Sequence, residues 1–227
     1  MKLSEVVPWG RSLAEYTLMF NLSESDWGKR ILGCGDGPAS FNGEMTARGL
    51  SVISVDPLYA FSPAEIRQRI EETHDTIVSQ LKPNTHRYVW DYFSDPDDLG
   101  RVRLEVMRTF LRDSEEGLAS GRYLVEALPL LRFADRQFDL CLCSHLLFLY
   151  SEQLSLEFHL ASIEELLRVG PEVRIFPLLT LDCQRSPYLE SVQSHFRSRG
   201  YAVDIVPVDY EFQRGGNEMM RLQRQTV

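Results

Sequence analysis

Short apolar runs alternate along the chain with longer segments in which apolar residues recur every three or four positions. A run that is apolar at nearly every position is typical of a strand buried on both faces, as in a parallel sheet. Spacing of three and four is typical of an amphipathic helix. The apolar runs predict strands at 31–33, 52–55, 123–127, 138–143, 172–178, 203–208 and 218–222.

The helical spacing fills the gaps between these strands. The sharpest helix start is Ser62-Pro63-Ala64-Glu65, a capping box with proline at the first helical position. The segments with helical spacing are 11–22, 39–48, 63–81, 99–111, 158–169 and 186–199. Alternation of strand and helix predicts a doubly wound α/β sheet whose ligand lies at the carboxyl ends of the strands. Gly215-Gly216, between the last two strands, predicts a terminal antiparallel hairpin.

One connection is unusually long. Roughly 65 residues separate Asp56 from Tyr123, whereas a βαβ unit needs about 30. We expect residues 60–120 to form a helical insertion that acts as a lid over the pocket and selects the substrate. The alternative is a helical layer that only enlarges the core. Its arginines would attract an anionic substrate or lie on a solvated face; they are Arg101, Arg103, Arg108 and Arg112.

The strongest chemical signal is the sequence Arg-Ile-Leu-Gly-Cys-Gly-Asp-Gly-Pro at 30–38. Its glycines suit a sharp turn that a ligand approaches closely, and the following helix directs its positive end toward that turn. Asp56, about 20 residues further on, stands where an acid can bind both ribose hydroxyls. The spacing is G-x-G-x-G, and Pro38 occupies the position where a dinucleotide fingerprint needs a small residue. A nucleoside without a bound pyrophosphate is therefore favoured.

These residues resemble motif I of the class I S-adenosylmethionine (AdoMet) dependent methyltransferases, in particular the methyltransferase type 11-like members. The resemblance continues, in order, in Val55-Asp56, in residues 133–140 and in residues 164–169, so that it covers about 28–183. It implies a Rossmann-like, mostly parallel seven-stranded sheet with its last strand inserted antiparallel. It also implies AdoMet as cofactor and S-adenosylhomocysteine (SAH) as product.

The resemblance assigns roles to several residues. The glycine turn would hold the methionine end, Asp56 the ribose, and Pro57 and Leu58 the adenine face. Glu126 or Ala127 would reach the adenine amino group. The cofactor-binding residues expected in this way are Gly33, Cys34, Gly35, Asp36, Gly37, Asp56, Pro57, Leu58, Glu126, Ala127 and Ser144.

Three positions leave alternatives open. Ile31 stands where the family usually has an acid for the methionine amino group; Asp36 could replace that acid or only hydrogen-bond its own turn. His145 lies at the strand edge expected to face donor and acceptor, and would be a catalytic base or a structural histidine. Trp9 and Tyr16 would cap the cofactor or anchor the first helix. We assign residues 210–217 a role in hairpin geometry only.

Composition limits the function further. The 227 residues include 33 acidic and 24 basic ones, a formal charge of -9, which disfavours nucleic acid as the main partner. Cys141 and Cys143 alternate in an apolar strand and are expected to be core thiols, and we expect no metal. The chain shows no linker, membrane span or signal-like apolar segment, which predicts one cytoplasmic domain, 1–227.

Taken together, the sequence predicts an AdoMet-dependent methyltransferase that acts on a small-molecule acceptor. Two alternatives remain open. One is a non-catalytic module that binds AdoMet or another nucleoside, and the other is an NAD-dependent oxidoreductase on a related sheet.

Overall fold

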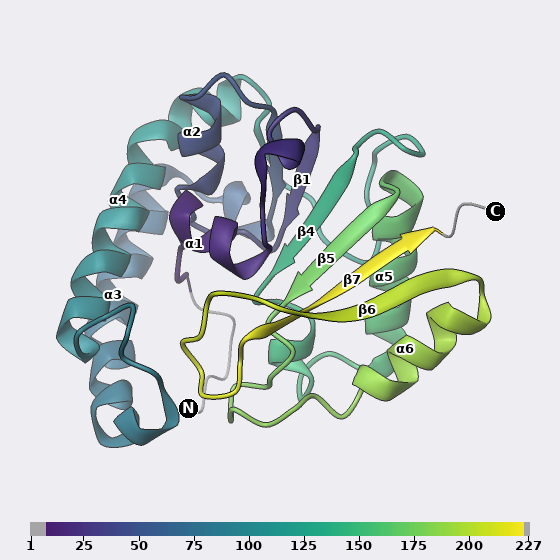
Figure 1. Ribbon diagram of the computed structural model, residues 1–227. Coiled ribbons are helices and arrows are strands. Elements are labelled where there is room, and N and C mark those ends of the chain that lie inside the picture. The colour runs from purple at the N-terminus through teal and green to yellow at the C-terminus, as the bar shows by residue number, and fades with distance from the viewer. Residues whose placement is uncertain (1–7, 225–227) are drawn as a thin grey trace.

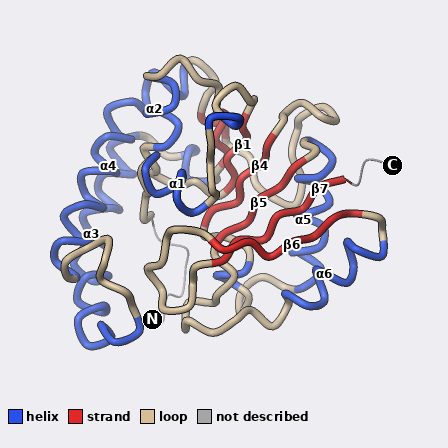
Figure 2. The backbone as a smooth tube through the Cα atoms, viewed as in Figure 1, coloured by secondary structure: helices blue, strands red, loops and turns tan. Residues whose placement is uncertain are grey.

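The computed structural model describes residues 8–224, which form one twisted sheet with helices packed around it (Figures 1 and 2). Seven strands lie in the order β3-β2-β1-β4-β5-β7-β6. Their bounds are β1 Ile31–Cys34, β2 Val52–Val55, β3 Tyr123–Leu124, β4 Leu140–Ser144, β5 Glu172–Phe176, β6 Tyr201–Pro207 and β7 Glu218–Arg224. The first five strands run parallel to one another, whereas β7 is antiparallel to both β5 and β6. The predicted doubly wound sheet with an antiparallel hairpin is confirmed.

The order of the strands reverses at β1, which pairs with β2 on one side and β4 on the other. Cys34 is in register with Val55 of β2 and with Cys143 of β4. The carboxyl ends of these three strands therefore meet at one edge of the sheet. In a doubly wound sheet the crevice outside such a switch point is where ligands bind.

The two faces of the sheet carry different helices. On one face Leu140 and Leu142 pack into a cluster with α1 (Leu13–Met19) and α2 (Phe41–Thr46). On the other face Cys141 and Cys143 pack into a cluster with α5 (Leu156–Val169) and α6 (Leu189–Ser198). The period-2 alternation within β4 thus divides the core into two layers. All four cysteines of the chain are free thiols.

The long connection after β2 folds into two paired helices, α3 (Pro63–Leu81) and α4 (Pro96–Ala119), with the short helices η2 (Pro57–Ala60) and η3 (Lys82–Arg87) beside them. The helices lie on the side of the sheet away from β6 and β7 (Figure 1), and α4 contacts β3. Their facing sides pack together with Tyr123 of β3 in a separate cluster that includes Ile66 and Phe110. The Ser62 capping box is present as predicted, with Ser62 Oγ accepting from the Glu65 N–H.

Several predicted boundaries are wrong by a few residues. Helix α4 is longer than the predicted 99–111, because Asp95 caps it and Pro96 starts it. Strand β3 ends at Leu124, not at 127, since an edge strand beyond its partner's end has nothing to pair with. Strand β5 stops at Phe176 because Pro177 cannot continue the ladder. No helix within residues 8–224 combines the length and apolar character needed to cross a bilayer.

The structure separates the four arginines of α4. Arg101, Arg108 and Arg112 lie on the solvent side, whereas Arg103 is only 1% exposed. Two nitrogens of Arg103 donate to the two carboxylate oxygens of Glu15 in α1, each at 2.6 Å. The Tyr210 hydroxyl donates to Glu15 Oε1 at 2.9 Å, and the guanidinium lies 5.2 Å from the centre of the Phe93 ring. This ion pair joins the N-terminal helix, the insertion and the segment before β7.

We expect Arg103→Met to lower the free energy of unfolding by about 3–5 kcal/mol, because it leaves the Glu15 carboxylate buried without its counter-charge. Arg101→Met, two residues away in an exposed i,i+3 pair with Asp98, should cost under about 1 kcal/mol. Urea unfolding of both variants measures the difference. The double variant Glu15→Leu/Arg103→Met should recover part of the loss. A cost for Arg103→Met no larger than for Arg101→Met would contradict this assignment.

Candidate functional site

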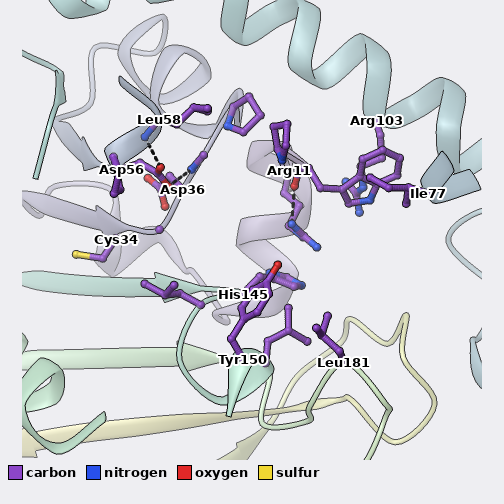
Figure 3. Close-up of a pocket in the computed structure, with 18 of the residues that line it drawn as sticks. Arg11, Cys34, Asp36, Asp56, Leu58, Ile77, Arg103, His145, Tyr150 and Leu181 are labelled. Atoms are coloured by element: carbon purple, nitrogen blue, oxygen red, sulfur yellow. Dashed lines mark hydrogen bonds between the residues drawn. The ribbon is translucent and has the colours of Figure 1, made fainter. Parts of the chain in front are cut away.

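A cavity of about 840 Å³ opens at the carboxyl ends of β1, β2 and β4 (Figure 3). Its walls come from the turn after β1, the residues that follow β2 and β4, the N-terminal segment, the insertion and residues 210–216. The volume lies within the range of about 300–1,000 Å³ that is usual for small-molecule sites. The cavity is where the strand order predicts a ligand.

The glycine turn borders this cavity through Cys34, Gly35, Asp36 and Gly37, whereas Gly33 is not part of the lining. A Cβ at Gly33 would stand 1.9 Å from Asp36 Oδ2, so this glycine makes room for the Asp36 side chain rather than for a ligand. Gly35 has a φ of +71°, which favours glycine, and its Cα packs against Leu146. The turn is thus closely packed from below as well as open to the cavity.

Asp36 directs its carboxylate into the protein. Tyr16 Oη donates to Oδ1 and Ser54 Oγ donates to Oδ2, both at 2.6 Å. Burial raises the pKa of Asp36 to about 6, against the hydroxyl hydrogen bonds that favour the charged form. Asp36 therefore ties the turn to α1 and β2, which neither alternative for this residue predicted. The same bond makes Tyr16 an anchor of the first helix, whereas Trp9 borders the cavity.

Asp56 follows β2 and borders the cavity beside the turn. Its Oδ2 accepts from the Gly37 N–H at 2.9 Å and its Oδ1 accepts from the Leu58 N–H at 2.8 Å. Burial raises its pKa above the usual value. Each carboxylate oxygen has two lone pairs, so each can accept one more hydrogen bond from a ligand.

The residues expected around adenine also border the cavity, next to Asp56. Pro57 and Leu58 follow Asp56 directly, and Glu126 and Ala127 come just after β3. The Glu126 carboxylate accepts a hydrogen bond from Arg132 Nε at 2.6 Å. The turn, Asp56 and these four residues therefore all border the same cavity.

His145 borders the cavity at the end of β4, whereas Ser144 does not. Its Nδ1 is hydrogen-bonded to Ser144 Oγ at 2.9 Å, and its backbone φ of 51° is one that residues other than glycine rarely adopt. Burial, followed by the charges of Arg11 and Arg103, lowers the pKa of His145 well below its usual value. The imidazole is therefore neutral at physiological pH and is a weak base.

Sequence reasoning missed several lining residues. Arg11 belongs to no motif, and a lone arginine before a helix gives no signal of a site. Residues 210–217 were expected to serve only the hairpin, but four of them border the cavity: Tyr210, Phe212, Gln213 and Gly216. The aromatic residues there could have been a signal, since Phe212 stacks on Tyr88 of the insertion with ring centres 4.7 Å apart. No group of three His, Cys, Asp or Glu in residues 8–224 is placed to hold a metal.

No protein-family model matches the chain. Among solved structures, it is similar to magnesium protoporphyrin IX methyltransferase (ChlM) from Synechocystis PCC 6803 with bound SAM, with 11% identity, 87% of this chain and 71% of that chain covered, and a TM-score of 0.47. It is also similar to a SAM-dependent methyltransferase from Methanosarcina mazei, with 13% identity, 88% and 94% covered, and a TM-score of 0.47. At these identities and scores, neither likeness carries an activity over to this chain.

A closer likeness is found to a protein of Methanocaldococcus jannaschii named "Uncharacterized protein MJ0045". The two are 32% identical over 225 residues, and the match covers 99% of each chain. The chain therefore belongs to the same protein family as MJ0045.

Proposed function

We propose that this protein is an AdoMet-dependent methyltransferase that acts on a small-molecule acceptor and releases SAH. One observation carries the proposal. The glycine turn after β1 and the carboxylate after β2 are joined by the hydrogen bond from Gly37 to Asp56, and together they border one end of a cavity at the switch point of the sheet. This combination suits a nucleoside with no pyrophosphate.

The residues at that end fit the cofactor. Asp56 has a free lone pair on each oxygen, as two ribose hydroxyls require. Pro57 and Leu58 would supply an apolar surface for adenine. Glu126 borders the same cavity. Gly35 and Gly37 let a ligand lie against the backbone. When bound, AdoMet supplies an electrophilic methyl group on a sulfonium.

The other end of the cavity would take the acceptor. Its walls are mainly apolar and come from α3, η4 (Phe148–Tyr150) and the segments after β5 and β6; they include Ile77, Leu81, Leu149, Leu181 and Phe212. Such walls exclude water and hold an apolar molecule in one orientation, which is the main requirement for an in-line transfer. The insertion would thus select the acceptor, as the sequence led us to expect.

His145 lies between the two ends in this arrangement. Its Nδ1 is hydrogen-bonded to Ser144 Oγ, and the residue borders the cavity. A neutral imidazole there can orient a hydroxyl or amine of the acceptor and accept its proton. Its lowered pKa makes it a poor general base on its own, so we assign it mainly to positioning the acceptor.

Asp56→Asn should weaken SAH binding by about 1.5–3 kcal/mol, roughly 10- to 150-fold, because charge-assisted hydrogen bonds to the ribose are lost. Calorimetric titration of the wild type and the variant measures this. Asp204→Asn removes a carboxylate that is 51% exposed on β6 and serves as the matched control, with affinity unchanged. An Asp56→Asn variant that binds SAH as tightly as the wild type would refute the role of Asp56.

The same titration tests the proposed function itself. A folded wild-type protein that binds neither AdoMet nor SAH would overturn the proposal. Binding of NADH in their place would favour the oxidoreductase alternative. Thermal unfolding of each variant shows whether a loss of affinity reflects a loss of structure, which matters because Asp56 also holds the backbone of the turn.

Asp36 predicts a dependence of stability on pH. Because its pKa is raised to about 6, the folded protein keeps a proton that the unfolded chain loses from about pH 4 upward. The contribution of Asp36 to the free energy of unfolding therefore falls as the pH rises from about 4 to about 6, and it is constant above about pH 6. Asp36→Asn removes this effect, so its unfolding free energy relative to the wild type should rise by about 2–3 kcal/mol between pH 4 and pH 7. Urea unfolding at several pH values measures it, and a constant difference would contradict it.

A further inference from the structure

The guanidinium of Arg11 borders the cavity with most of its donors unused. Its Nη1 donates to the Trp9 carbonyl oxygen at 2.6 Å, and its Nε is buried without a hydrogen-bond partner in the described part of the chain. No carboxylate of residues 8–224 forms an ion pair with it. Arg11 is half-buried, and a cation with a buried donor that has no partner is costly, so this arrangement favours an anion.

Arg11 is held on the glycine turn by its backbone. Gly10 packs so closely on the turn that a Cβ there would lie 2.0 Å from the Pro38 carbonyl oxygen. The Arg11 carbonyl oxygen accepts from the Ser40 N–H at 3.1 Å. Figure 3 shows the Arg11 side chain extending from this segment toward His145, between the Asp56 end of the cavity and the end formed by Ile77 and Leu181. The guanidinium thus lies between these two groups of lining residues.

The neighbouring charges leave the charge of Arg11 unbalanced. Arg103 is neutralised by its two hydrogen bonds to Glu15. Asp36 is held by Tyr16 and Ser54, and Asp56 is held by two backbone N–H groups. Burial, and next the charge of Arg103, lowers the pKa of Arg11 to about 10, so it stays protonated at neutral pH. Within residues 8–224 no carboxylate is hydrogen-bonded to Arg11, and a ligand carboxylate in the cavity would supply the counter-charge.

We propose that Arg11 is the carboxylate-binding residue of this cavity and receives a ligand carboxylate through its unused N–H groups. The planar fork of a guanidinium matches a carboxylate in geometry as well as in charge. The carboxylate has two possible sources: the methionine end of AdoMet, in which case the inference rests on the proposed function, or an acceptor that is itself a carboxylic acid. The first source would also explain Ile31, since the methionine end would be recognised by its carboxylate instead of its amino group.

Two ligands separate these sources. SAH carries the amino-acid carboxylate, whereas 5′-methylthioadenosine has the same adenosine and thioether but no carboxylate. Both ligands are titrated by calorimetry into the wild type and into Arg11→Met. If the methionine end is the source, the substitution should lower the affinity for SAH by about tenfold or more. It should change the affinity for 5′-methylthioadenosine by less than about twofold. The SAH affinity of Arg11→Lys should lie between those of the wild type and Arg11→Met, because lysine keeps the positive charge but loses the planar pair of N–H donors. Arg108→Met, an exposed arginine of α4, is the matched control and should change neither affinity.

A second pair of ligands tests the acceptor. Benzoate and its neutral counterpart benzamide are titrated into the protein with SAH present and with SAH absent. If Arg11→Met loses benzoate binding while its affinities for benzamide and SAH stay unchanged, the proposal is supported. The carboxylate that Arg11 binds then belongs to the acceptor. Equal weakening of SAH and 5′-methylthioadenosine would overturn it, because the loss would then be structural. The proposal would also be overturned if Arg11→Met lost affinity neither for SAH relative to 5′-methylthioadenosine nor for benzoate relative to benzamide.

These outcomes are distinct from failure of the proposed function. If the wild type bound neither SAH nor 5′-methylthioadenosine, the methyltransferase proposal would fail, and the benzoate pair without SAH would still decide the role of Arg11. Thermal unfolding of Arg11→Met beside Arg108→Met controls for the lost bond to Trp9.

Discussion

The buried ion pair between Glu15 and Arg103 is the interaction on which the shape of the cavity depends. Glu15 also caps α1 through the Ser12 N–H, and Arg103 also donates to the Gly10 carbonyl oxygen. The pair therefore fixes the N-terminal segment, which carries Arg11, against the insertion, which forms the far wall. Because both charges are buried, neither can leave the pair without a large cost. The result is that the N-terminal segment and the insertion, which both border the cavity, are held in a fixed position relative to each other.

Much of the fold could be predicted from short-range patterns. Apolar runs mark the central strands because a parallel strand buried on both faces has no polar positions. The glycine turn and Asp56 could be found because their spacing is a property of one strand-turn-helix unit, in which every contact is local. The antiparallel insertion of β7 came from the resemblance to methyltransferases, since no local pattern distinguishes it from an added edge strand.

The rest of the site depends on contacts between distant segments. Arg103 and Arg101 look alike in sequence, and only the position of Glu15 across the fold makes one of them buried. The inward direction of Asp36 depends on Tyr16 and Ser54, which lie 20 and 18 residues away. Arg11 and residues 210–216 lie far apart in the sequence, and both border the cavity because the fold brings the N-terminal segment and the segment after β6 to the same place. Tertiary packing, which no local pattern encodes, decided each of these cases.

The hydrogen bond from Tyr210 to Glu15 joins residues 195 positions apart, and this has a consequence for biosynthesis. At about 5–20 residues per second, a ribosome makes the second partner roughly 10–40 s after the first. During that interval the sheet lacks β6 and β7, and the wall formed by residues 210–216 has not been made. Contacts of such long range also slow folding. The nascent chain therefore cannot complete the wall of the cavity until residues 210–216 have been made.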